Sequence, residues 1–96
     1  MVYTVIKVKE DREMTNLRMF AVKFLGPTET LGARIKINDL RTGDVRVINY
    51  DYSKSQDYEV AMDFLEARRI PILGHAWDDR TGRSYLLSDN FDISIL

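Results

Sequence analysis

Apolar and polar residues alternate with a period of two in six stretches of this chain, which is the pattern of half-buried β-strands. The stretches are residues 2–9, 17–25, 33–40, 45–52, 72–77 and 83–88. Residues 17–25 are largely apolar on both faces, which predicts a central strand covered on both sides. Ala33, Ile35 and Ile37 are expected to point inward, and Arg34, Lys36 and Asn38 outward.

One further stretch has the period of a helix. Its apolar residues recur at i, i+3, i+4 and i+7: Tyr58, Ala61, Met62 and Leu65. Residues 53–55 contain serines that can cap a helix, and Pro71 prevents its continuation. The spacing predicts one helix over residues 56–69.

The order of these elements is four strands, one helix and two or three strands. This order predicts an α+β fold: a single domain over residues 1–96, with a mostly antiparallel sheet of five to seven strands and one helix packed on a face. The side chains expected to form the core are Phe20, Val22, Phe24, Ile35, Ile37, Val47, Met62 and Leu65.

Short loops join the strands. Arg41-Thr42-Gly43 and Arg80-Thr81-Gly82 repeat the same tripeptide, and each glycine can adopt the left-handed conformation that closes a hairpin. The C-terminal residues 91–96 alternate once more. They predict either a seventh strand or an apolar edge that meets a partner, which includes a homodimer through this tail.

Composition narrows the functional classes. The 96 residues carry 14 basic and 15 acidic side chains, a net charge of −1, so charge-driven recognition requires a local patch. The chain has no cysteine, which excludes disulfides and thiolate chemistry. No signal-peptide pattern begins it, and no apolar run reaches the roughly 20 residues that a membrane span needs. We therefore expect a cytoplasmic protein without membrane contact.

A local patch of positive charge is predicted around residues 23–36. Lys23, Arg34 and Lys36 flank a loop that contains Thr28 and Thr30, and hydroxyls, backbone amides and cations together suit a phosphate or another anion. The alternative is a solvated polar face with no ligand. Lys7, Lys9 and Arg12 form a second basic stretch.

Arg46, Tyr50 and Tyr52 share one parity, so Arg46 is expected to extend the basic face toward two tyrosines that can stack on bases. The alternative is that the tyrosines cover the sheet edge and pack against the helix.

The sequence gives no sign of catalysis. His75 is the single histidine, and the consecutive Asp78 and Asp79 beside it would point to opposite faces of a strand. No phosphate loop, dinucleotide fingerprint or metal motif occurs. We therefore predict a protein that is not an enzyme and has no cofactor and no metal.

Two longer segments carry a resemblance. The run Lys23-Phe24-Leu25-Gly26-Pro27-Thr28, followed by Thr30 and Gly32-Ala33-Arg34-Ile35-Lys36, precedes Asn49-Tyr50-Asp51-Tyr52 before the helix. This pattern resembles an uncharacterised family of small proteins from phages, plasmids and integrated mobile elements. The resemblance implies a mobile-element setting and no particular reaction.

Two functional hypotheses follow. The first is an accessory protein that contacts nucleic acid or phosphate through the basic sheet face. The second is an inhibitor or adaptor that binds a host or phage protein and acts by occlusion on host defence or replication machinery.

Overall fold

The computed structural model describes residues 3–5 and 17–96. The rest of the first predicted strand, the loop at residues 10–16, and Lys7, Lys9 and Arg12 lie outside the described residues. The elements are β1 (Tyr3–Val5), β2 (Arg18–Leu25), β3 (Arg34–Asp39), β4 (Val45–Asn49), α1 (Asp57–Ala67), β5 (Gly74–Asp78) and β6 (Arg83–Ser88). Among the described residues, no helix is long and apolar enough to cross a membrane.

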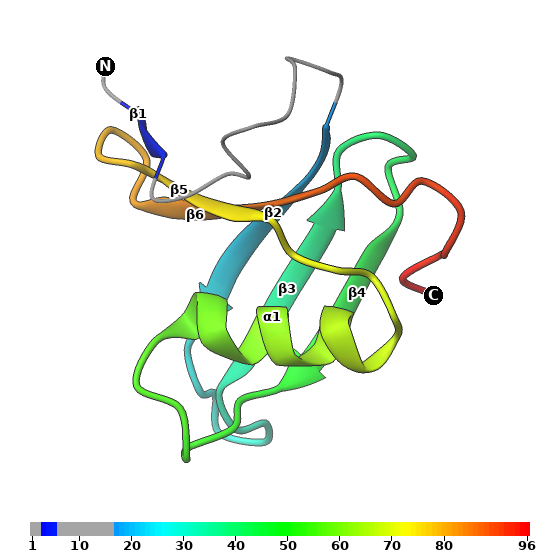
Figure 1. Ribbon diagram of the computed structural model, residues 1–96. Coiled ribbons are helices and arrows are strands. Elements are labelled where there is room, and N and C mark those ends of the chain that lie inside the picture. The colour runs from blue at the N-terminus through cyan, green and yellow to red at the C-terminus, as the bar shows by residue number, and fades with distance from the viewer. Residues whose placement is uncertain (1–2, 6–16) are drawn as a thin grey trace.

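The described strands form one antiparallel sheet in the order β1-β5-β6-β2-β3-β4. β2 is an interior strand, as predicted, but the prediction that it is covered on both sides was wrong, because Met19 and Lys23 are exposed on the face away from α1. Figure 1 shows α1 lying across one face of the sheet, where it contacts β2, β3 and β6. The α+β fold class, the order of the elements and the antiparallel sheet are thus confirmed.

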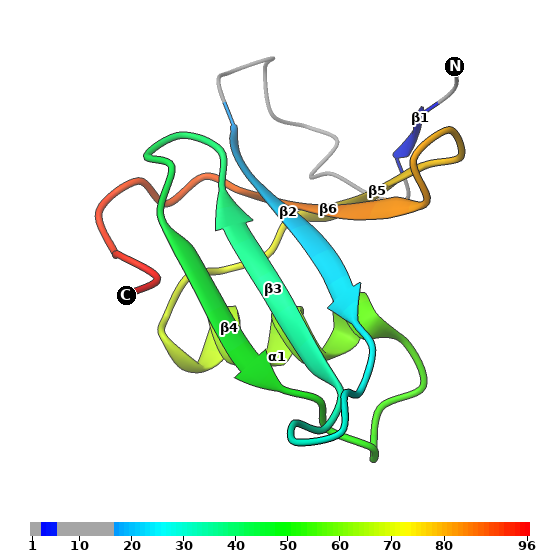
Figure 2. The same cartoon turned by 180° about the vertical axis from the view of Figure 1, so that it is seen from behind.

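Cross-strand register sorts the side chains onto two faces. Phe20 lies opposite Asp39 and Val22 opposite Ile37, and these pairs face α1. Lys23 lies opposite Lys36 on the other side, which we call the open face. Figure 2 views the sheet from this side, with α1 behind β2, β3 and β4.

The core lies between the sheet and α1. Its buried residues are Phe20, Val22, Ile35, Ile37, Val60, Ala61, Leu65, Ile70, Leu86 and Ile95. Five of the eight predicted core residues are among them, and Met62 packs against them half-buried. The prediction was wrong for two side chains, because Phe24 is 47% exposed and Val47 is 44% exposed.

Position and register explain these two errors. Phe24 faces the helix side, but it lies at the end of β2, where its ring contacts only the edge of Tyr50 (5.6 Å, 84°). Val47 lies opposite Lys36, on the open face, because the hairpin pairs Asp39 with Asp44 and so turns Arg46 and Ile48 inward.

The two Arg-Thr-Gly hairpins share one hydrogen-bond pattern. Asp39 and Asp78 each accept the backbone N–H of the residue two positions later, at 3.0 Å. Gly43 (φ 84°) and Gly82 (φ 67°) then take the predicted left-handed conformation, which a side chain disfavours.

Local capping sets both ends of α1. At the start, the Glu59 carboxylate accepts the Gln56 N–H (3.0 Å) and the Ser55 hydroxyl (2.9 Å). At the end, the Ile70 N–H donates to the Leu65 carbonyl across Arg69, which has a left-handed φ of 66°. The helix is therefore shorter by a residue or two at each end than predicted.

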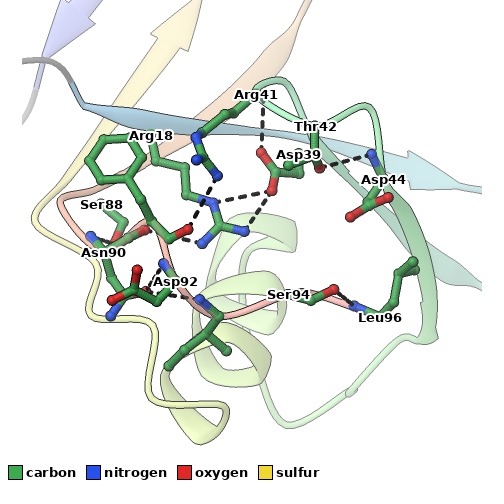
Figure 3. A network of polar contacts seen from close by, with 12 residues as sticks. Arg18, Asp39, Arg41, Thr42, Asp44, Ser88, Asn90, Asp92, Ser94 and Leu96 are labelled. Atoms are coloured by element: carbon green, nitrogen blue, oxygen red, sulfur yellow. Dashed lines mark hydrogen bonds and ion pairs between the residues drawn. The ribbon is translucent and has the colours of Figure 1, made fainter.

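A buried ion pair joins β2, β3 and the C-terminal tail (Figure 3). Arg18 is 2% exposed, and its Nε and Nη2 donate to Asp39 Oδ2 at 3.1 and 2.6 Å. Its Nη1 donates to the Asn90 carbonyl at 3.1 Å. All three branches of the guanidinium therefore have partners in place of water.

Hydrogen bonds decide the charge state of Asp39. Burial alone would raise the pKa of its carboxyl. The hydrogen bonds from Arg18 and from the Arg41 N–H, together with the charge of Arg18 and the Thr42 hydroxyl, outweigh burial and hold the pKa below 3.8. The stability gained from the ionised form is therefore present above pH 3.8 and is lost as the pH falls through the folded-state pKa.

The tail folds back over the core on the helix side. Its backbone turns at Asn90, whose side chain accepts the N–H groups of Asp92 and Ile93 (Figure 3). Arg41 donates to the Phe91 carbonyl (3.2 Å) and lies over the Phe91 ring. Ile95 is fully buried. The tail is therefore not a seventh strand, because side-chain caps direct it into the core of its own chain; a homodimer through this tail stays a prediction.

Replacing Asp39 with asparagine should lower the free energy of unfolding by about 3–5 kcal/mol at pH 7, because Arg18 would remain buried without a counter-charge. Urea denaturation measures this loss. Asp79→Asn, which removes the same charge from an exposed turn position, should change stability by less than about 0.5 kcal/mol. Equal effects of the two substitutions would show that the ion pair of Arg18 and Asp39 does not contribute to stability as argued.

Two neighbouring residues test the packing of the tail. Ile95→Ala should cost about 2–5 kcal/mol, because it leaves a cavity among buried side chains. Leu96→Ala, at a side chain that is 60% exposed, should cost less than about 0.5 kcal/mol. Thermal melts of both variants make the comparison, and a small effect of Ile95→Ala would show that the tail does not belong to the core.

Candidate anion-binding face

Cations gather on the open face of the sheet. Lys23 comes from β2, Arg34 and Lys36 come from β3, and Arg83 begins β6 beside them. We call these four residues the cationic face. None of the four has an ion pair or side-chain hydrogen bond among the described residues.

Lys23 and Lys36 lie directly opposite each other on adjacent strands. Like charges at such positions destabilise a sheet, because their Cβ atoms are only about 4.5–5.5 Å apart. The pair is the least favourable electrostatic arrangement on this face. An anion held between the two ammonium groups would remove the repulsion.

A small depression of about 60 Å³ lies at this pair. It is lined by Ala21, Lys23, Lys36, Asn38 and Arg83. Ala21 leaves the floor open, and the Asn38 amide adds a hydrogen-bond donor beside the cations. The lining has the charge and hydrogen-bonding character of a site for a single phosphate-sized anion.

Arg34 extends the cationic face toward the end of the sheet. It lies opposite Leu25 on one side and Asn49 on the other. Its Nε is buried but has no hydrogen-bond partner. An unsatisfied buried donor of this kind is costly.

Among the described residues, acidic side chains are scarce on the same surface. The open-face positions of β2, β3, β4 and β6 hold no aspartate or glutamate within the paired residues. The first carboxylate on this side is Asp78 on β5, opposite Arg83. It is 3% exposed and accepts the Arg80 N–H and the Thr81 hydroxyl. The field over the cationic face is therefore positive although the whole chain is not.

The threonine loop was predicted to add donors, but its amides are engaged internally. Thr28 Oγ1 accepts the N–H groups of Thr30 (3.4 Å) and Leu31 (3.0 Å), and the Thr28 N–H donates to the Leu31 carbonyl (2.7 Å). Both threonines are exposed at the end of the sheet that Arg34 begins. They border the cationic face but do not line the depression.

The predicted extension of the basic face through Arg46 was wrong. Arg46 lies opposite Ile37, on the helix side, and its guanidinium carbon lies 5.4 Å from the centre of the Phe64 ring. Tyr50 is half-buried on the same side, against the core. Tyr52 is 77% exposed and lies 5.2 Å from the Tyr50 ring. These three residues therefore do not join Lys23 and Lys36 on one surface.

Three residues of the depression, Ala21, Asn38 and Arg83, were missed from sequence. Arg83 reaches Lys23 only because β6 pairs with β2, a contact between residues some sixty positions apart in the chain. Asn38 shares the outward parity of Arg34 and Lys36, so its position was predicted but its role was not. Parity within β3 was a signal for Asn38, and no local pattern indicated Arg83.

His75 stacks on Tyr58, with ring centres 3.9 Å apart and planes 12° apart. Burial lowers its pKa, and nearby Asp57 offsets part of that effect. Its Nε2 is buried without a partner. Within residues 3–5 and 17–96, no group of histidine and carboxylate side chains could hold a metal ion.

No protein-family model, curated protein or solved structure matches the chain. The resemblance to a family of mobile-element proteins therefore stays a prediction.

The stability of the protein should fall as the pH drops below about 6.5, the ordinary pKa of histidine. His75 has a lowered pKa when folded, so the unfolded chain binds a proton first, and the stability that is present above pH 6.5 is lost below it. Urea denaturation between pH 7.5 and 5.5 measures the slope. His75→Phe, which retains an aromatic ring against Tyr58, should flatten the slope of stability against pH. An unchanged slope would show that other titrating groups cause the pH dependence.

Proposed function

We propose that this protein is a small accessory binding protein that holds the phosphate backbone of a nucleic acid against its cationic face. The observation that supports the proposal is the directly opposed pair of Lys23 and Lys36, beside a depression that also receives Arg83. A protein tends to keep a locally unfavourable arrangement where it serves function. The proposed role needs no catalytic residue, and a phage or other mobile element is its proposed setting.

Phosphate is the anion that this surface favours. Arginine offers a planar fork of donors and lysine a compact charge, and both are common in phosphate recognition. An exposed, nearly flat face suits an extended backbone better than a small metabolite, which would require a deeper pocket. With about four cations, affinity should be modest and should fall steeply with salt.

A protein-binding inhibitor or adaptor is the second candidate. Its support is a row of aromatic rings at one end of the sheet, in which Phe24 meets Tyr50 and Tyr50 meets Tyr52. Phe24 and Tyr52 are 47% and 77% exposed. Exposed aromatic side chains of this kind are common anchors in protein interfaces. Such a partner would not require Lys23 or Lys36.

Charge removal tests the first candidate. The double substitution Lys23→Gln with Lys36→Gln should weaken the binding of labelled oligonucleotides measured by fluorescence anisotropy at low salt. Two lost phosphate contacts should flatten the slope of log affinity against log salt by about 1.4 for single strands and about 1.8 for duplex. In the absence of ligand, the same variant should unfold at equal or higher denaturant, with a gain of about 0.2–1 kcal/mol.

The matched control is Lys54→Gln with Arg80→Gln, which removes two positive charges away from the cationic face. Lys54 pairs with Asp63 (3.4 Å) across an exposed surface, and Arg80 lies in an exposed turn. The control should leave the salt slope close to that of the unmodified protein. Absence of oligonucleotide binding at low salt would reject the first candidate and favour the second.

A further inference from the structure

The outer side of β4 carries unpaired backbone groups. Among the described strands, β4 is the last of the sheet and pairs only with β3. The Tyr50 N–H donates to the Ala33 carbonyl and the Asp39 N–H donates to the Asp44 carbonyl, so the even-numbered positions of this ladder turn toward β3. Val45, Val47 and Asn49 therefore point their N–H and C=O groups away from the sheet. No backbone hydrogen bond within the described residues reaches these groups.

Within the described residues, the backbone groups of this edge have little of the usual protection against strand pairing, although the C-terminal tail passes beside β4 on the helix side (Figure 1). Sheet edges are generally blocked by lysine, proline, a bulge or a covering segment. β4 has the sequence Val-Arg-Val-Ile-Asn, and its one charge, Arg46, lies over the Phe64 ring on the helix side. Val45 and Val47 are 41% and 44% exposed. The C-terminal tail folds into the core beside α1, and it forms no backbone hydrogen bond with β4.

We infer that β4 pairs with β4 of a second copy of this chain, antiparallel and with the two-fold axis at Val47. The three outward-facing residues are centred on Val47, so this register uses all of them. Val47 meets Val47 of the second copy, and Val45 meets Asn49 of the second copy. Each such pair exchanges two hydrogen bonds, which gives about six across the junction.

Charge disfavours one of the two neighbouring registers, and the other pairs fewer of the outward-facing residues of β4. The register centred on Val47 places Arg46 opposite Ile48 of the second copy, whereas a shift by two residues places the two Arg46 side chains opposite each other. On the open face, the two Lys36 side chains would be three strand spacings apart, about 14 Å. That distance exceeds the Debye length of about 8–10 Å at ordinary salt, so the two cationic faces do not oppose pairing.

Pairing through β4 would join two sheets into one and set both open faces on the same side. The cationic face would then be repeated on a continuous surface, which a longer nucleic acid could span with added avidity. The inference itself does not rest on the proposed function, since the backbone edge and the valines carry it without a ligand.

Single cysteines test the register, because the chain contains none of its own. Directly opposed residues have Cα atoms about 5.5 Å apart, within the disulfide range of about 4.4–6.8 Å. Val47→Cys should therefore give a disulfide-linked dimer on mild oxidation. Val45→Cys is the matched control, since the two copies of that residue would be about 14 Å apart along the strands. We expect at least a tenfold difference in the initial rate of cross-linking, and similar rates, or none at either site, would overturn the inference.

Sedimentation of the cysteine-free protein gives an independent readout. The apparent mass should rise from 11.2 kDa toward twice that value with increasing concentration. Val47→Lys should remain monomeric at every concentration, because lysine on the edge blocks pairing. Met19→Lys adds the same charge to an exposed open-face position on central β2 and should still dimerise. A monomeric wild type throughout would overturn the inference and leave the edge to a different protein.

Discussion

Arg18 and Asp39 form the contact on which the helix side of the molecule depends. Their charges are fully enclosed, so each requires the other, and the remaining Arg18 donor requires the Asn90 carbonyl. The tail must therefore lie over the end of β2 and β3 for the pair to remain dry. Once the tail is held there, Ile95 completes the core beside α1. One ion pair thus couples a hairpin, a terminal segment and the apolar packing between them.

The basic side chains divide into two groups by what they contact. Arg41, Arg46 and Arg68 lie over aromatic rings at 5.0–5.4 Å, and Arg18 has Asp39. These contacts hold their arginines against other parts of the same chain. The four cations of the cationic face have no such partner among the described residues, and they lie together on one side of the sheet. The positive field of the cationic face therefore arises from this division of the basic side chains and not from the total charge of the chain.

Periodicity predicted the strands, the helix and their order well, because each depends on neighbours in the sequence. It could not decide which side chains of β4 point toward the helix, because odd and even positions both contain apolar side chains. The choice between Val47 and Ile48 as the inward residue is made by the hairpin that pairs Asp39 with Asp44. Arg46 was misplaced for the same reason. The roles of Arg18 and Arg83 depend on β2 pairing with β3, β6 and the tail, and no local pattern contains that information.

One helix and one tail can cover only one face of a sheet this wide, so the described open face must remain soluble by other means. Alternating lysine and glutamate would achieve this and would also gain favourable cross-strand pairs. The cationic face instead uses one sign of charge and places Lys23 against Lys36. Solubility explains the presence of charge there but not its uniform sign. The anion that we propose would account for both, because it would convert the repulsion between the two lysines into attraction toward a shared ligand.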